Sequence, residues 1–263
     1  MREELIIMTQ VSPHGLHHVT AIATDPQSTV DFYTRALGLR LVKQTVNFDA
    51  PDTYHLYYGD EKGSPSSLLT FFPWPGVPQG RQGAGMTTAT AFSVPGTAIG
   101  WWQTRFKQLG IDADEPRARD QEEVLTFRDP DGMVIDLVAS EGDHRSGWDG
   151  VADIPAEHAV RGLHAITLSE RQLDPSATML TELLGMSLTA IVPGSRRVGC
   201  FRVPPVDSKI GITTSNHELV NGIRGHEPTD FTTEFAQRCH PDSQDVLGAL
   251  RQRSHLGSLK SPT

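Results

Sequence analysis

Apolar residues along this chain recur at every second position in some segments and at every third or fourth position in others. The alternating run at 16–24 predicts a strand, because successive side chains of a strand point to opposite faces. A helix is predicted over 27–37, opened by Asp25-Pro26 and ended by Gly38. Strand-like runs follow over 39–48, 53–60 and 66–73. The first unit is therefore predicted as one strand, one helix and three further strands.

The same order of elements is predicted again further along the chain. A strand at 86–94 is followed by a helix near 99–109 and then by strands at 122–129 and 133–140. Pro130-Asp131-Gly132 predicts a tight turn between those two strands, since proline fixes φ and glycine accepts a positive φ. A third unit is predicted over 160–216. A fourth begins near 229, with room for a strand and a helix but not for the remaining strands.

One short motif marks the repeat directly. Gly15-Leu16-His17-His18 returns as Gly162-Leu163-His164-Ala165, so the second copy keeps one histidine of the pair. Together with the element order, this predicts an α+β fold of repeated strand–helix–three-strand modules with curved mixed sheets. We expect two domains, 14–142 and 157–263, joined by a linker at 143–156 that is rich in Gly, Asp and Pro, with the fourth module truncated.

Composition narrows the class of protein. A length of 263 residues, 37% hydrophobic and 21% charged residues are typical of a globular protein with a substantial core. The net charge of −9 argues against nucleic acid and anionic membrane surfaces as partners. No apolar run is long enough to span a membrane, and no signal peptide is evident. The two cysteines form no metal or disulfide pattern, so a cytoplasmic location is expected.

These segments resemble the vicinal oxygen chelate superfamily, whose modules are βαβββ. The motifs that carry the resemblance are GLHHVTA at 15–21, YHLYYGDEKGSP at 54–65, FRDPDG at 127–132 and RGLHAITL at 161–168. The HH pair with YHLYYGD is most similar to the branch of ring-cleaving dioxygenases that open hydroquinone-type rings. The resemblance implies a small aromatic substrate, and it leaves a homo-oligomer open.

By resemblance, this branch binds one Fe(II) or Mn(II) ion through two histidines and a glutamate. Such a set leaves positions open for a chelating substrate and O₂. His18 matches the first ligand. The other two belong to the fourth module, where this chain has Thr232 and Thr233 in place of histidines and lacks the strand that carries the glutamate. Either one such ion or no bound metal is therefore expected.

Four further residues are candidates for the site. The resemblance gives His17 a catalytic, proton-handling role and makes Thr20 a substrate-binding wall, although His17 could equally be a bonded structural histidine and Thr20 a packing residue. Asp136 is the alternative metal ligand, or else an exposed strand residue or a carboxylate bonded to nearby backbone. His55 is expected to pack in or near the same cup.

Three functions stay open from the sequence. The first is metal-dependent oxidative opening of hydroquinone-like aromatic rings. The second is binding or sequestering of a small molecule without a metal, and the third is a glyoxalase-type lyase reaction. The number of metal ligands that meet at His18 distinguishes the first from the second.

Overall fold

Three units with the same order of elements follow one another in the computed structural model, which describes residues 15–119, 122–151, 153–192, 198–203 and 208–214. The first unit comprises β1 (His18–Ala23), α1 (Pro26–Asp31) with its π-helical continuation η1 (Phe32–Ala36), β2 (Arg40–Val46), β3 (Tyr54–Gly59) and β4 (Leu68–Pro73). The second comprises β5 (Met86–Val94), α2 (Ile99–Leu109), β6 (Arg117–Arg119), β7 (Glu122–Arg128) and β8 (Val134–Ala139). The third comprises β9 (Gly162–Glu170), α3 (Leu173–Thr178) with η2 (Met179–Leu183), β10 (Ser187–Val192), β11 (Val198–Val203) and β12 (Ser208–Thr214).

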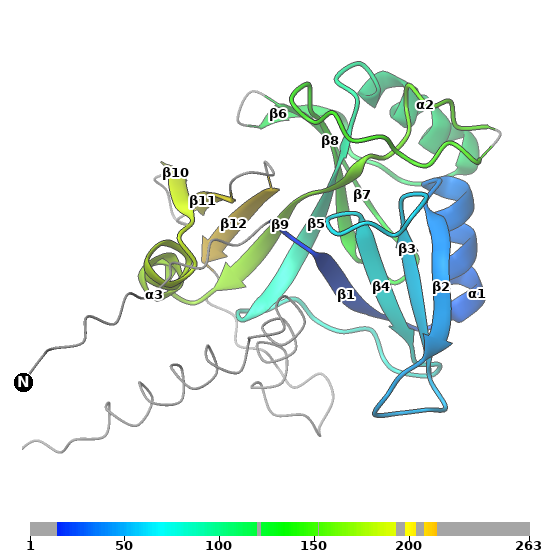
Figure 1. The fold of residues 1–263 in the computed structure, drawn as a ribbon, viewed down its shortest axis with the longest axis horizontal. Helices are drawn as coiled ribbons and strands as arrows, with labels where there is room; N and C mark the ends of the chain where they lie inside the picture. The colour runs from blue at the N-terminus through cyan, green and yellow to red at the C-terminus, as the bar shows by residue number, and fades with distance from the viewer. Residues whose placement is uncertain (1–14, 120–121, 152, 193–197, 204–207, 215–263) are drawn as a thin grey trace, which may run out of the picture. The chain divides into compact units, whose positions relative to one another are not determined.

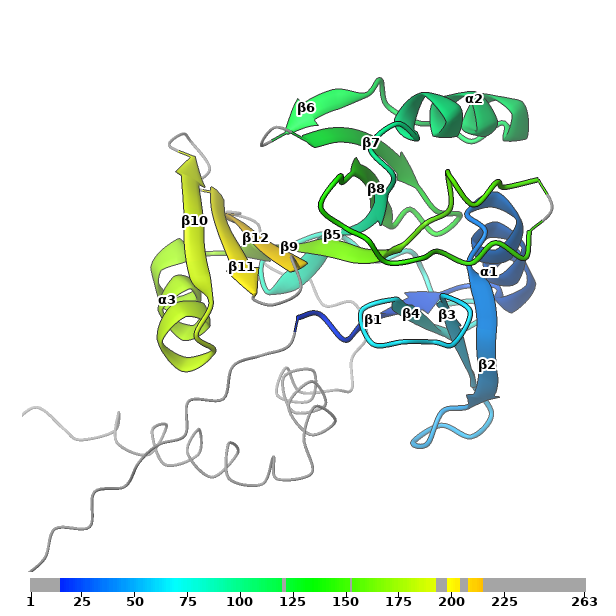
Figure 2. The same cartoon turned by 45° about the horizontal axis from the view of Figure 1, so that its top comes forward.

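The strands form two mixed sheets (Figure 1). Sheet A has the order β1-β4-β3-β2, with β1 parallel to β4 and the other pairs antiparallel. Sheet B has the order β10-β11-β12-β9-β5-β8-β7-β6 and contains every strand of the second and third units. The antiparallel pair β5–β9 joins those two units at the centre of sheet B (Figure 2). The predicted α+β class with mixed sheets is confirmed.

Together α1 and η1 span 26–36, within one residue of the predicted helix at 27–37 at each end. The Asp25 carboxylate accepts a hydrogen bond from the Ser28 amide at 2.6 Å, which is an N-cap, and Pro26 occupies the first turn. The chain leaves the helical segment at Gly38, whose φ of +71° suits glycine. Tyr33 then packs its ring against Tyr58 and Phe71, with centroids 5.3 and 4.8 Å away. The helix therefore covers one face of sheet A and leaves the opposite face to other contacts.

The predicted turn at 129–132 ties the second unit to the first. Asp129 accepts hydrogen bonds from the amides of Asp131 and Met133, and Gly132 adopts a φ of +85°. The Asp131 carboxylate reaches the first unit, where it accepts from the Thr24 amide at 3.1 Å and the Thr24 hydroxyl at 2.5 Å. This turn thus holds the end of β1 opposite to His17 and His18 in place.

The segment predicted as a linker is held by hydrogen bonds at several points. Arg145 donates to the carbonyl oxygens of Ser66 and Leu163, at 2.9 and 3.0 Å. Ile154 is buried in the main core, and Asp153 pairs with Arg105 at 3.0 Å. The division into domains at 14–142 and 157–263 stays a prediction, because the whole of the predicted fourth unit lies outside the described residues.

No helix among the described residues is long and apolar enough to cross a membrane.

Candidate functional site

The face of sheet A that α1 does not cover carries the residues marked by the sequence. Val19, Ala21 and Ala23 of β1 pack with the core. Because strand side chains alternate, His18 and Thr20 point to the opposite face. Neighbouring strands add to that face at matched register, since Thr20 pairs with Thr70 on β4 and Thr70 pairs with Tyr57 on β3. We call this surface the polar face of sheet A.

His17 and His18 lie side by side at the start of β1. Their Nδ1 atoms are 3.0 Å apart, and the rings meet edge to face with centroids 5.2 Å apart. Strict alternation would have placed them on opposite faces, but His17 precedes the first residue of the strand. The backbone turns there, after Gly15 at a φ of +103°, and the His17 carbonyl accepts from the Ser66 amide at 2.8 Å. The structure therefore brings both histidines together.

Thr20 belongs to a row of hydrogen bonds that crosses three strands of the polar face. Its hydroxyl lies 2.9 Å from that of Thr70, which is 3.1 Å from His55 Nε2. The other ring nitrogen of His55 is 2.9 Å from the Tyr57 hydroxyl. The His55 ring also packs between Tyr57 and Phe72, with centroids 4.1 and 4.0 Å away. The polar face thus combines hydroxyl groups, imidazoles and aromatic rings.

Asp136 lies on β8 of sheet B and not on the polar face of sheet A. Its side chain is buried, with one oxygen 2.7 Å from Arg119 Nη1 and the other accepting from the Thr126 hydroxyl at 2.6 Å. Both carboxylate oxygens are therefore engaged within sheet B. The carboxylate is thus bonded to side chains and buried, whereas the sequence had suggested an exposed residue or bonds to backbone, and the structure does not bring Asp136 together with His18.

A second charged cluster of sheet B joins the second and third units. Glu122 on β7 accepts from Lys209 on β12 at 2.7 Å and lies 3.1 Å from Nε2 of His164 on β9. Burial favours the neutral acid, but the hydrogen bonds and charges of His164 and Lys209 outweigh it and lower the pKa of Glu122 to about 2. His164, the repeat mate of His17, is therefore in hydrogen-bond contact with the carboxylate that Lys209 pairs with.

The described residues do not assemble a complete metal site. No group of three His, Cys, Asp or Glu side chains that could hold an ion occurs within the part of the chain that the structure describes. A site of the two-histidine, one-carboxylate type needs three such ligands. The described residues offer His18 as one, so the others would have to come from the remainder of the chain or from another subunit.

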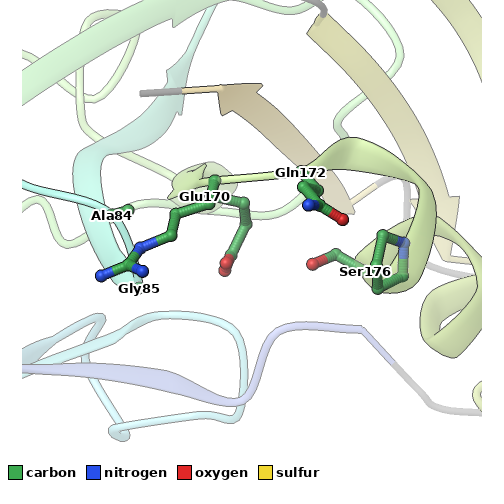
Figure 3. Close-up of a pocket in the computed structure, with 7 residues that line it drawn as sticks. Ala84, Gly85, Glu170, Gln172 and Ser176 are labelled. Carbon is green, nitrogen blue, oxygen red and sulfur yellow. The ribbon is translucent and has the colours of Figure 1, made fainter. Parts of the chain in front are cut away.

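A separate pocket of about 350 Å³ lies between the start of β5 and the start of α3. Figure 3 shows Glu170, Gln172 and Ser176 around this space, with Ala84 and Gly85 at its other side. Burial raises the pKa of Glu170 there. None of the five candidates from the sequence, His17, His18, Thr20, His55 and Asp136, lines this pocket.

Sequence reasoning missed three residues: Thr70 on the polar face of sheet A, and Glu122 and Lys209 in the charged cluster of sheet B. Alternation along β3 placed His55 in the cup, but Thr70 carries no motif and its contact depends on the register of β1 with β4. Glu122 and Lys209 are 87 positions apart, and only the pairing of β5 with β9 brings their strands into one sheet. The spacing of apolar residues predicts where strands lie but does not tell which residues of two paired strands stand opposite each other.

The fold and the motifs on β1 and at the 129–132 turn define the class of protein. Residues 15–137 match the family model described as Glyoxalase/Bleomycin resistance protein/Dioxygenase superfamily. The chain therefore contains a domain of this superfamily at residues 15–137. Its fold is also that of maize glyoxalase I, a mutant of which superposes with a TM-score of 0.58 at 15% identity, covering 78% of this chain and 68% of that one.

More specific relatives are ring-cleaving dioxygenases by name. A Bacillus subtilis (strain 168) protein named "Putative ring-cleaving dioxygenase MhqO" is 40% identical over 172 residues, covering 65% of this chain and 54% of its own length. A Sphingobium indicum protein named "Chlorohydroquinone/hydroquinone 1,2-dioxygenase" is 36% identical over 160 residues, covering 58% and 49%. The crystal structure of a putative dioxygenase from B. subtilis superposes with a TM-score of 0.72 at 34% identity, covering 77% of this chain and 64% of that one.

This chain spans about half the length of the curated relatives it matches. Their names imply small-molecule substrates, and dioxygenases of this superfamily are typically metal-dependent. The particular substrate and metal of this chain are therefore matters for a proposal.

Proposed function

We propose that this chain acts in the oxidative opening of hydroquinone-like aromatic rings, with the ring bound on the polar face of sheet A. The observation that carries the proposal is the convergence of His17, His18 and Thr20 with the His55–Tyr57–Phe72 stack on one face. Such a surface offers flat contacts for an aromatic ring and polar groups for its oxygens. Supporting it, a relative with 36% identity is named for hydroquinone and chlorohydroquinone.

Each predicted residue has a defined part in this proposal. His18 is the metal ligand, and the metal of the family is Fe(II) or Mn(II). His17, whose ring contacts His18 at 3.0 Å, handles a proton beside the bound ring. Thr20, two residues along the same side of β1, contacts a ring oxygen. Asp136 is left to its structural role with Arg119.

The test is ring opening under air with hydroquinone and an excess of added Fe(II), followed by the absorbance of the ring-opened product. We expect low but measurable activity that the substitution His18→Ala abolishes. His158→Ala is the matched control, because His158 also contacts an aromatic ring, that of Trp101, but lies outside the polar face. Equal activity of both variants, or none in the unaltered chain, contradicts the proposal.

A second candidate function is binding of the same aromatic molecules without a metal. It is favoured by the absence of a three-ligand group within the described residues. In that case hydroquinone binds the chain saturably, the affinity is unchanged by a chelator, and no ring opening follows on adding Fe(II). The two functions therefore differ in one measurement, turnover with added metal.

A further inference from the structure

We propose that His55 is a positioning residue that orients the Thr20 hydroxyl as a hydrogen-bond donor, so that the polar face prefers an aromatic ligand whose ring oxygen is a phenolate. This inference rests on the proposed function to the extent that the aromatic ring binds this face. It adds His55, Thr70 and Tyr57 to the residues that determine which ligand is bound.

The row Tyr57–His55–Thr70–Thr20 is continuous, and each of its contacts has the length of a hydrogen bond. Its three contacts measure 2.9, 3.1 and 2.9 Å. Thr70, in the middle, is only 1% exposed. A hydroxyl buried to that degree costs free energy when it lacks a partner, so the contacts on both of its sides are held in the folded protein. Ring contacts with Tyr57 and Phe72 also help to hold the His55 ring in this position.

A row of this kind can be polarised in two directions. Each hydroxyl has one hydrogen to donate, and a neutral imidazole donates from one nitrogen and accepts at the other. If Tyr57 donates to His55 Nδ1, then Nε2–H donates to Thr70, Thr70 donates to Thr20, and Thr20 is left with its hydrogen for a ligand. If the order is reversed, Thr20 donates to Thr70 and presents only an acceptor to the ligand.

The exposed Lys43 favours one of the two directions. Its ammonium group lies 5.4 Å from the centroid of the Tyr57 ring. A cation beside a phenol draws electron density from the ring, which makes the hydroxyl a better donor and a poorer acceptor. Tyr57 therefore donates to His55, and hydrogen bonds in a chain reinforce one another along the row. Thr20 consequently donates outward, on the same side of β1 as His18.

The ligand chemistry follows from this direction. A fixed donor at Thr20 stabilises an oxygen that accepts, and hydrogen bonds to a charged acceptor are stronger than bonds to a neutral one. A phenolate oxygen gains more from this donor than the corresponding phenol does. The polar face should therefore bind hydroquinone-like rings with one oxygen deprotonated in preference to the neutral ring.

The preference can be measured with 4-nitrophenol, whose absorbance distinguishes phenol from phenolate. At the pH where half of the free probe is ionised, we expect more than half of the bound probe to be ionised. Thr70→Val removes the relay hydroxyl but keeps a β-branched side chain. It should return the bound probe to the ionised fraction of the free probe and weaken binding of the phenolate on the order of tenfold.

Three further variants show whether the row acts as a unit. Thr70→Ser keeps the hydroxyl and should restore the preference. Thr45→Val is the matched control, because Thr45 pairs with His55 across β2 and β3 but no described hydrogen bond joins it to the row. Thr20→Val should abolish the preference, and adding Thr70→Val to it should cost nothing more, because Thr70 acts through Thr20.

Several results would overturn the inference. These are an unchanged ionised fraction in Thr70→Val, an equal effect of Thr45→Val, additive losses in the Thr20/Thr70 double variant, or no saturable binding of 4-nitrophenol. A bound probe that is less ionised than the free probe would show the opposite direction of the row. None of these measurements needs a metal or turnover. Binding with the expected preference but without ring opening therefore rejects only the proposed function.

Discussion

At the scale of single residues, Glu122 couples the stability of sheet B to pH. Its side chain is 22% exposed and lies against His164 and Lys209, and its pKa falls to about 2. An unfolded glutamate titrates near 4.3. Because the folded pKa is lower, the stabilisation is fully present above the unfolded value and is lost as the pH falls from about 5 to about 2. The contribution is roughly 2–3 kcal/mol.

The substitution Glu122→Gln removes this charge and nearly preserves the shape of the side chain. We expect it to lower the free energy of unfolding by roughly 2 kcal/mol at neutral pH and to flatten the loss of stability between pH 5 and pH 3. Denaturant unfolding at several pH values measures both effects. Glu123→Gln, the exposed neighbour on β7, should leave the pH profile unchanged. A profile for Glu122→Gln as steep as that of the unaltered chain would contradict the assignment.

The site residues show where sequence reasoning ends. The repeated GLH motif was enough to single out His17 and His18, and alternation along β1 placed Thr20 on the face of His18. The contact between the two histidines depends on where β1 begins, one residue after His17. The bond from Thr20 to Thr70 depends on strand register. Neither fact is encoded in the spacing of apolar residues.

At the scale of elements, α2 contains two glycines whose backbone conformations predict opposite effects of the same substitution. Gly110 ends the helix with a φ of +68°, and Gly100 lies in the first turn; a Cβ at either would meet no atom within 4 Å. Alanine at Gly110 must adopt a left-handed conformation, which costs about 1 kcal/mol. At Gly100, alanine is the better helix former by about 0.5–1 kcal/mol.

We therefore expect Gly110→Ala to lower and Gly100→Ala to raise the midpoint of thermal unfolding. Since the added methyl group meets no atom within 4 Å in either variant, the difference between them reports backbone conformation and not side-chain packing. A shift of the same sign for both would show that the end of α2 is not constrained as described. Differential scanning calorimetry of the two proteins beside the unaltered chain is sufficient.

Most strands and helices of the first two units were predicted to within two residues, and the shortest strand was not predicted. The strand at 86–94 and the helix at 99–109 match β5 and α2 in both bounds. The three-residue strand β6 was missed, because Arg117-Ala118-Arg119 has no apolar alternation and pairs with β7 only through the backbone ladder. The π-helical turn η1 was also not foreseen, since its apolar spacing is close to that of an α-helix.

At the scale of the whole described molecule, Arg145 links backbone segments that belong to both sheets. Its guanidinium donates to Ser66 just before β4, to Leu163 on β9 and to the carboxylate of Asp143. Burial opposes the ionisation of Asp143, but hydrogen bonds from Arg145 and Ser93 prevail and lower its pKa to about 2. The predicted linker therefore contains an arginine that connects the two sheets through hydrogen bonds. The Gly-, Asp- and Pro-rich composition of the segment did not indicate this.

Arg145→Gln should be strongly destabilising for this reason. It leaves the Asp143 carboxylate, which is 11% exposed, without its cation, and it removes the bonds to Ser66 and Leu163. We expect a loss of roughly 3 kcal/mol in the free energy of unfolding. Arg128→Gln, which removes an exposed guanidinium bonded to the Gly132 carbonyl, should cost less than about 1 kcal/mol. Similar losses of stability in the two variants would mean that the hydrogen bonds of Arg145 do not stabilise the contact between the sheets.

The metal affinity of the whole chain depends on how many ligands meet at His18. A three-ligand site filled at one hundred times its Kd stabilises a protein by about 2.7 kcal/mol, which is a rise of roughly 5–10 °C in Tm for a chain of this size. The described residues bring together no such group, so we expect added Fe(II) or Mn(II) to change Tm very little. We also expect any metal that copurifies to be removed by dialysis against a chelator, and His18→Ala to change the retained metal hardly at all.

A rise in Tm of several degrees that disappears in His18→Ala would contradict this prediction, because it requires further ligands from the rest of the chain or from a second subunit. Under that outcome, tight metal binding and ring opening should be lost together in the variant.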